Sequence, residues 1–185
     1  TPGFSPGTLN YTVDVATGVT SVAVAATKSD PNAVVSGDVP NSGQATIPLD
    51  GPGTSKTVSV TVTAPNQVFK IYGITINRLA PSNDANLLAL TVSAGTLNPG
   101  FAAGTPNYTV NVTASVDSLT VTATKSDPNA VMSASGSVIA PAEVPTGSVG
   151  RALGLGTTTL FTITVIAQDG VSTRPYTINV FRDAR

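Results

Sequence analysis

The side chains that could perform chemistry are few and scattered. The 185 residues include no His and no Cys, which excludes Ser-His-Asp and Cys-His nucleophiles, imidazole acid–base catalysis, and zinc, haem or iron–sulfur sites built on those ligands. Glycoside hydrolysis needs a pair of carboxyl groups, and Glu143, the single glutamate, has no evident partner in the irregular stretch that holds it. We therefore predict that the protein is not an enzyme.

Carboxylate and amide oxygens recur in one motif. Asp30 and Asn32 belong to a Ser-Asp-Pro-Asn sequence that returns with Asp127 and Asn129, and Asp84 lies between the two copies. A calcium ion takes about six to eight oxygen ligands, several of them carboxylates, whereas the aspartates here are spread along the whole chain. Ser-Asp-Pro-Asn also favours a turn, because Asp and Asn bond nearby backbone groups and Pro fixes its own φ. We expect turns, with calcium binding by these residues as the alternative and no other cofactor.

Two lysines and one glycine-rich segment have chemical interpretations that we do not favour. Lys28 and Lys125 stand close to Asp and Asn, as in an internal isopeptide crosslink, but such a bond needs a buried lysine and we expect both to lie in polar turns. The segment 51–57 resembles a phosphate-binding loop, yet Ser55 replaces the glycine before Lys56 and a Val-rich strand follows. We expect a hairpin turn there.

Strand-forming residues dominate the rest of the sequence. Val and Thr are frequent and prefer extended backbone, whereas 17 Gly and 14 Pro leave no uninterrupted stretch for an amphipathic helix. Apolar and polar residues alternate, as in Tyr11, Val13 and Val15, and a period of two is typical of an antiparallel sheet with one buried face. The pattern predicts an all-β protein.

Charge and hydropathy limit the partners. Lys and Arg number nine against ten Asp and Glu, so we expect no binding to nucleic acid or to an anionic membrane surface, both of which need a basic excess. No apolar run approaches the roughly 18 residues of a membrane span, so we expect no membrane insertion in this segment. Proteins, further copies of the chain or a glycan remain as partners.

The chain repeats itself. Residues 26–34 recur unchanged as 123–131, and the stretch 72–78 aligns with 176–182. The second copy carries extra residues, mainly between 135 and 159, which we expect to form loops because insertions collect there. About seven short strands per copy predict two tandem immunoglobulin-like antiparallel β-sandwich domains. The expected boundaries are 1–79 for the first domain, 80–86 for a linker and 87–185 for the second domain.

Four spaced motifs in and after the second copy's first strand carry a family resemblance. They are Leu87-x-x-Leu90-x-Val92-x-x-Gly95-x-Leu97-x-Pro99-x-Phe101, Tyr108-x-Val110-x-Val112, Asp127-Pro128-Asn129 and Tyr176-x-Ile178-x-Val180-x-Arg182. The combination resembles the bacterial cadherin-like β-sandwich repeat over residues 85–183 fully and 1–78 in part. The resemblance implies an immunoglobulin-like module of bacterial secreted and cell-surface proteins, with no activity of its own.

The first copy begins without the strand that opens the second copy at residues 87–92. We expect the first domain to lack its N-terminal strand and about four buried apolar side chains, each of which contributes roughly 1.5–3 kcal/mol. The loss also exposes a sheet edge. Three explanations stay open: the strand precedes Thr1 in a longer protein, a neighbouring copy supplies it, or the first sheet tolerates one strand fewer.

Phe69 and Phe181 have no aromatic counterpart in the other copy, so we predict them as exposed contact residues. Taken together, these features predict a non-catalytic structural or adhesive module that acts as a rigid spacer or assembly unit of an extracellular or cell-surface bacterial protein. One alternative is the subunit of a self-assembling extracellular filament that uses β-strand addition. The other is a carbohydrate-binding accessory module.

Overall fold

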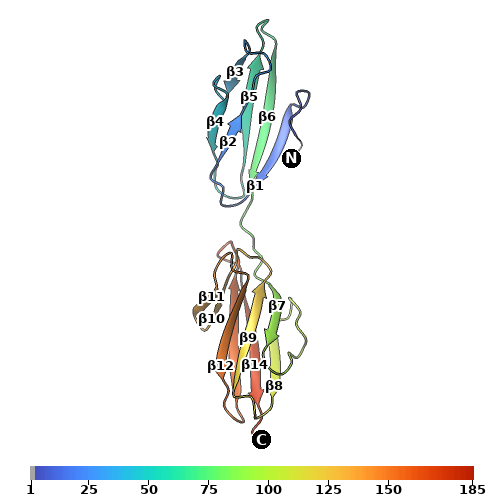
Figure 1. Ribbon diagram of the computed structural model, residues 1–185, viewed down its shortest axis with the longest axis vertical. Helices are drawn as coiled ribbons and strands as arrows, with labels where there is room; N and C mark the ends of the chain where they lie inside the picture. Colours follow the sequence, from blue (N-terminus) through green and yellow to red (C-terminus); the bar gives the residue numbers. More distant parts are fainter. Residues whose placement is uncertain (1–2) are drawn as a thin grey trace. The chain divides into compact units, whose positions relative to one another are not determined.

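Two β-sandwiches follow one another along the chain, which divides between Pro81 and Ser82. The computed structural model describes residues 3–185, all of them in strands and connecting segments (Figure 1). Domain 1 contains β1 (Asn10–Val15), β2 (Ser21–Ala25), β3 (Val34–Gly37), β4 (Gln44–Pro48), β5 (Ser55–Thr63) and β6 (Phe69–Arg78). Domain 2 contains β7 (Leu87–Val92), β8 (Asn107–Val112), β9 (Ser118–Lys125), β10 (Val131–Ala134), β11 (Ser137–Ala140), β12 (Thr146–Ala152), β13 (Thr158–Ile166) and β14 (Thr173–Arg182). The predicted all-β tandem fold is confirmed.

Domain 1 packs a four-stranded sheet against a two-stranded one. The larger sheet has the order β1-β6-β5-β3, and the smaller consists of β2 and β4. Because side chains alternate across a strand, Val58, Val60 and Ile76 of the larger sheet face Val24 and Ile47 of the smaller sheet in one core. The core of this domain is therefore built from aliphatic side chains on the inner faces of the two sheets.

Domain 2 has one more strand in each sheet. The order of the larger sheet is β11-β10-β13-β14-β8, and the smaller is β12-β9-β7. Its core cluster holds 21 buried residues, against six in domain 1, within the part of the chain that the structure describes. The additional strands β7 and β11 thus accompany a much larger buried core.

One pair of strands in each domain runs parallel. In domain 1, β1 lies parallel to β6 with Val13 opposite Ile76, and in domain 2, β8 lies parallel to β14 with Val110 opposite Val180. A parallel pair needs a long connection between its strands, and here the rest of each sandwich supplies it. The other strand pairs are antiparallel, as the sequence predicts.

Two expectations about connecting segments are wrong. The turn at 51–54 joins β4 to β5, which belong to different sheets, so it crosses the sandwich instead of closing a hairpin. The extra residues of the second copy are not all loop, because β11 pairs with β10 through a tight turn at Ser135 and Gly136. Both turn residues have positive φ, the backbone geometry of a two-residue hairpin. The strand counts are accordingly six and eight instead of about seven.

An arginine near the end of the last strand closes each sandwich. In domain 1, Arg78 donates from Nε to the Thr17 carbonyl (2.9 Å) and from Nη1 to the Asp50 carbonyl (2.8 Å). Arg182 makes the same bonds to the carbonyls at the matching positions of domain 2. A planar guanidinium with several fixed donors can hold two backbone segments at once. The two domains therefore share this framework, and their differences lie elsewhere.

Candidate functional site

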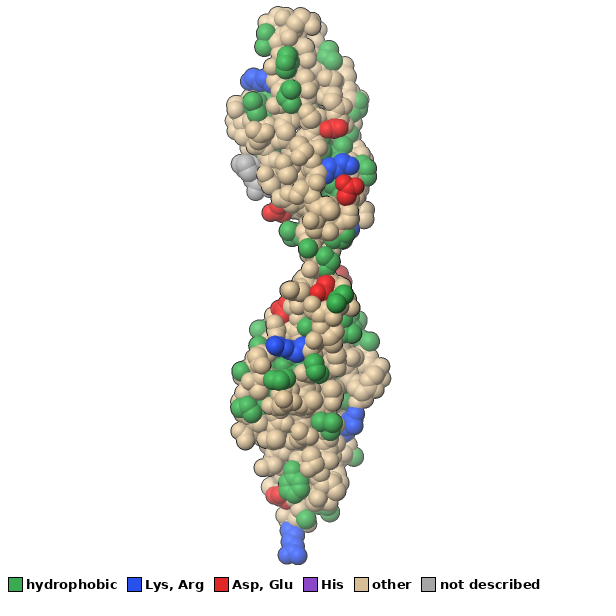
Figure 2. Space-filling view, turned by 180° about the vertical axis from the view of Figure 1, so that it is seen from behind, with side chains coloured by type: hydrophobic (Ala, Val, Ile, Leu, Met, Phe, Trp, Pro, Cys, Tyr) green, Lys and Arg blue, Asp and Glu red, His purple; other side chains and the backbone are tan. Residues whose placement is uncertain are grey.

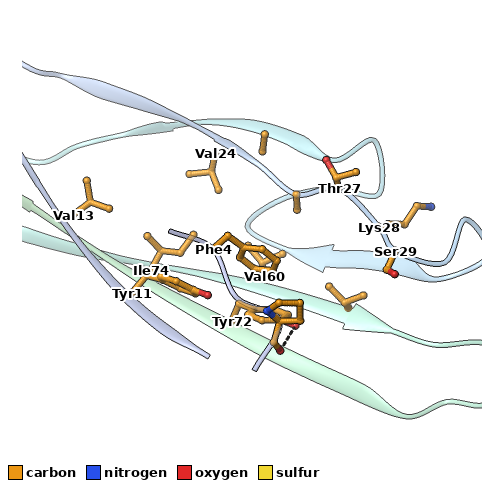
Figure 3. A pocket seen from close by; sticks show the side chains of 14 residues that line it. Phe4, Tyr11, Val13, Val24, Thr27, Lys28, Ser29, Val60, Tyr72 and Ile74 are labelled. Carbon is orange, nitrogen blue, oxygen red and sulfur yellow. Dashed lines mark hydrogen bonds between the residues drawn. The ribbon is translucent and has the colours of Figure 1, made fainter. Parts of the chain in front are cut away.

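An open apolar groove lies in domain 1 beside β2, where the two-stranded sheet ends (Figure 3). Its volume is about 560 Å³. Tyr11, Val60 and Tyr72 from the four-stranded sheet line it, together with residues 24–29 from the end of β2. Phe4 also lines the groove, with its ring centroid 5.8 Å from that of Tyr72, and 73% of Phe4 is exposed. The groove is thus an opening into the core between the two sheets.

In domain 2 the matching space is filled by β7. This strand runs antiparallel to β9 and pairs with residues 121–125, with Leu90 opposite Ala123 and Val92 opposite Val121. By the repeat offset of 97, residues 121–125 correspond to 24–28 in domain 1, and all five of those residues line the groove. The groove therefore occupies the position that β7 has in domain 2.

The burial of the groove walls follows from this difference. Three fully buried residues of domain 2 have half-buried counterparts in domain 1: Tyr108 and Tyr11, Tyr176 and Tyr72, and Ile178 and Ile74. In domain 2 the cover comes from Leu87 and Leu90 of β7, which are 1% and 3% exposed. Side chains that form the core of domain 2 are therefore accessible surface in domain 1.

One tyrosine hydroxyl has a different set of partners in the two domains. In domain 2 the Leu87 N–H donates to Tyr176 Oη (3.1 Å), and the Tyr176 O–H donates to the Ala103 carbonyl (3.0 Å). In domain 1 the Tyr72 O–H donates to the Pro6 carbonyl (3.2 Å), and within residues 3–185 its oxygen receives no N–H. Tyr72 thus offers a hydrogen-bond acceptor at the groove.

Lys125 is buried in domain 2. It is 2% exposed, and its ammonium donates to the carbonyls of Pro128, Ala130 and Pro141, which use all three of its N–H donors. Burial lowers the pKa of Lys125, and the charge of Asp127 opposes that change. The expectation that this lysine lies in a polar turn is wrong, because the loops around it turn their carbonyl oxygens inward.

Lys28, the counterpart of Lys125, stands at the groove of domain 1. It is half-buried, and its ammonium donates to Asn41 Oδ1 (3.4 Å). The two lysines share a sequence motif of nine identical residues, from 26 to 34 and from 123 to 131. The different burial of the two side chains therefore comes from the strands and loops that surround them and not from the motif.

The repeated Asp and Asn residues form turns. The Asn32 N–H donates to Asp30 Oδ1 (2.9 Å), and the Asn129 N–H donates to Asp127 Oδ1 (2.8 Å). These are the Asx-turn bonds that the sequence predicts. Across residues 3–185, no three acidic side chains come together in a group that could hold a metal ion. The structure therefore places these calcium candidates in separate turns, and calcium binding stays a prediction.

Asp84 lies at the beginning of domain 2 and is held by its neighbours. Its Oδ1 accepts the backbone N–H of Asn86 (2.8 Å) and the side-chain amide of Asn86 (2.7 Å). Burial would raise the pKa of Asp84, but hydrogen bonds from Ser126 and Asn86 and the charge of Arg174 outweigh burial and hold it below 3.8. Asp84 thus already has a positive charge beside it, supplied by Arg174.

Phe69 and Phe181 lie on the outer faces of the larger sheets. Phe69 is 60% exposed at the start of β6, and Phe181 is 39% exposed near the end of β14, so they mark opposite ends of equivalent strands. Phe69 and the exposed Val34 of β3 flank Thr63 from its two sides. Their role as contact residues stays a prediction. On the face shown in Figure 2, charged side chains are few and scattered.

The sequence predicts the missing strand but not the residues that its absence exposes. Tyr11 and Tyr72 repeat in the second copy as Tyr108 and Tyr176, and such repetition indicates framework residues instead of site residues. The register of residues 87–92 against 121–125 is the signal that identifies the groove. That register depends on a bulge between Leu87 and Ala89, and no alternation pattern in the sequence reveals it.

The model of the cadherin-like beta sandwich domain family matches residues 1–79 and, separately, residues 87–183. The chain belongs to this cadherin-like β-sandwich family. Its two matched regions carry the two sandwiches described above, so the resemblance seen in the sequence is confirmed. The chain is therefore a tandem pair of cadherin-like β-sandwich domains. Within residues 3–185 there is no helix with the length and apolarity needed to cross a membrane.

The chain is similar to one curated relative and to two solved structures. A protein of Evansella cellulosilytica that is named as a membrane protein is 39% identical to this chain over 103 residues. That match covers 55% of this chain and 14% of the relative, so the chain spans a small part of the relative's length. The structure of extracellular cadherin domains 3–6 of protocadherin gamma B2 aligns with 95% of this chain over 46% of its own length, at 11% identity and a TM-score of 0.35. A chimeric titin Z1Z2 aligns with 95% of this chain and 94% of its own, at 12% identity and a TM-score of 0.35.

Proposed function

We propose that this chain is a non-catalytic spacer within a bacterial cell-surface or secreted protein. The observation that carries the proposal is where the polypeptide enters and leaves each sandwich. In domain 2 the Asp169 N–H donates to the Ser82 carbonyl (3.0 Å), which places the incoming chain beside the turn before β14. The outgoing chain follows the other end of β14, ten residues later, or about 30 Å of extended strand.

Domain 1 has the same arrangement. Phe4 contacts Tyr72 near the start of β6, and the chain leaves after Arg78 at the end of that strand. A sandwich whose two connections lie at opposite ends separates whatever is joined to it by the length of its strands. The chain has no His and no Cys, its outer surface is rich in Thr, and it carries few charges. This composition suits a structural part better than a catalytic one.

The filament alternative has one observation in its favour, which is the open groove of domain 1. A filament built by strand addition also needs a strand to donate. The strand of matching pattern in this chain is β7, whose Leu87 and Leu90 are buried in its own domain. Donation would remove both side chains from their own domain and uncover its core at Tyr108 and Tyr176, so we propose the spacer and not the filament.

The spacer proposal can be tested in the source bacterium and in solution. Antibodies raised against the chain should label intact cells or the secreted fraction. Replacing residues 3–185 in the native polypeptide by an unrelated tandem pair of β-sandwiches should preserve the activity of the domains it joins, whereas deletion should impair it. Loss of that activity on replacement would contradict the proposal. Long fibres in a sedimentation experiment at high protein concentration would favour the filament.

A further inference from the structure

The walls of the open groove in domain 1 correspond, residue by residue, to the surface of domain 2 that β7 covers. Residues 24–28 correspond to the five residues of β9 that pair with β7, and all five line the groove. Tyr11 and Tyr72 correspond to the buried tyrosines beneath Leu87 and Leu90. The groove is therefore shaped for an extended strand and not for a compact ligand.

The required strand can be described from domain 2. It runs antiparallel to β2, adding a third strand to the two-stranded sheet. Apolar side chains are needed at the positions of Leu87, Leu90 and Val92, since these face the core. Its first backbone N–H would be donated to Tyr72 Oη, as the Leu87 N–H is to Tyr176 Oη.

We propose that this groove is the docking site of a β-strand of the Leu87–Val92 type, supplied by polypeptide joined directly to the N-terminal side of domain 1. In domain 2, β7 continues through residues 93–106 into β8, and Phe101 of that connection packs against the core. Its counterpart Phe4 lines the groove, so polypeptide preceding Phe4 is joined at the groove itself.

The connection favours this source over a second copy of the chain. A strand tethered by a short segment has an effective concentration of about a millimolar or more, which a strand from another molecule reaches only in concentrated solution. A second copy would also have to withdraw β7 from a sheet in which it pairs with five residues of β9. A tethered strand needs no concentrated solution and takes no strand out of another sheet.

A docked strand would also change the surroundings of Lys28. In domain 2, Leu87 is paired with Lys125, and the lysine is buried behind it. The docked strand would place its first apolar residue opposite Lys28 in the same way. The Ala26 N–H already donates to the Gly43 carbonyl (2.8 Å), so the amides of this segment that face the open edge are those of Ala25 and Thr27. The exchange of these two amides reports on docking directly.

The test extends the full chain by its own β7. A second copy of residues 86–97 is placed directly before Thr1, which restores the spacing of domain 2 because Thr1 corresponds to Asn98. We expect the unfolding transition of domain 1 to rise by about 10 °C or more, and amide exchange of Ala25 and Thr27 to slow by at least about 100-fold. The transition of domain 2 should stay unchanged. No change in domain 1 would overturn the proposal.

Two variants and one measurement separate docking from a general effect of the extension. Leu87→Asp and Leu90→Asp, introduced only in the added copy, should abolish the stabilisation. Ala26→Glu, on the groove wall opposite the copied Leu90, should do the same. Because Ala26 also packs against the core of domain 1, its effect is measured as the difference between the extended and the unextended Ala26→Glu proteins. The extended protein should sediment as a monomer at every concentration. Concentration-dependent oligomers would show that the strand enters a neighbouring molecule and would overturn the proposed source.

Discussion

The two domains have the same framework and differ in how completely their cores are covered. The closing arginine, the repeated Asx turns and one parallel strand pair, β1 with β6 or β8 with β14, occur in both. β7 covers Tyr176 in domain 2, whereas its counterpart Tyr72 faces an open groove in domain 1. The comparison teaches that an identical motif of nine residues has a different environment when the strand beside it changes. The predictions below test which contacts make the difference.

The largest effect is expected from removing an apolar anchor of β7. Leu90→Ala should lower the free energy of unfolding of domain 2 by about 3 kcal/mol, because a buried side chain is lost and a cavity remains. The matched control is Leu88→Ala on the same strand, where 67% of the side chain is exposed and little change is expected. Denaturant unfolding followed by site-resolved hydrogen exchange measures both. Equal effects would mean that β7 does not cover the core.

A comparable effect is expected from the buried lysine. Lys125→Met keeps the apolar stem but leaves the carbonyls of Pro128, Ala130 and Pro141 without their donor. We expect domain 2 to lose about 2–3 kcal/mol. Lys28→Met in domain 1 should cost less than about 0.5 kcal/mol, because that side chain has solvent access and a single long hydrogen bond. Thermal unfolding of the two variants measures both losses of stability. A larger loss for Lys28→Met than for Lys125→Met would contradict the comparison.

A smaller effect is expected from the paired tyrosines. Tyr176→Phe removes the acceptor of the Leu87 N–H and the donor to the Ala103 carbonyl, both of them buried or partly buried. Domain 2 should lose about 1 kcal/mol. Tyr72→Phe removes only the exposed bond to Pro6 and should change domain 1 by less than about 0.5 kcal/mol. Chemical denaturation of the two variants measures the difference.

The pH dependence of domain 2 tests the contacts at its N-terminal end. The pKa of Asp84 in the folded protein lies below that of an ordinary aspartate, so its contribution to stability is present above the ordinary value and is lost as the pH falls through the folded value. Asp169 has its pKa lowered in the same direction by hydrogen bonds from the Ser172 side chain and from the backbone N–H groups of Val171 and Ser172. The stability of domain 2 should therefore decrease in acid, and Asp84→Asn should flatten that decrease. An unchanged profile in the variant would contradict this assignment.

The smallest effect on stability is expected at the outer aromatic residue. Phe69→Ala should change the unfolding of domain 1 by less than about 0.5 kcal/mol, because 60% of the residue is exposed. Its effect on binding is the informative result. If Phe69 is a contact, the variant should lose retention by a partner or on a glycan array while its fold is unchanged. Retention equal to that of the parent chain would remove Phe69 from the contact residues.

The sequence predicts the fold through features that are local and periodic. Alternating residues, turn sequences and the internal repeat define strands and their inner faces, and the absent first strand follows from aligning the copies. The burial of Lys125 is not predicted, because the loop that supplies the Pro141 carbonyl lies 16 residues further along the chain. The strand β11 is missed because it has only four residues, Ser137–Ala140, and follows a Ser-, Ala- and Gly-rich stretch at 133–136 that gives little strand signal.

Amide hydrogen exchange of the whole chain tests the central comparison most directly. Residues 24–28 in domain 1 and 121–125 in domain 2 correspond in the repeat, but only the second set is paired with a neighbouring β7. The account predicts that the amides of Ala25 and Thr27, which face the open edge, exchange at least about 100-fold faster under native conditions than those of Thr122 and Thr124, which face β7. Equal protection of the two segments would contradict it, because the open edge of domain 1 would then be covered as fully as that of domain 2.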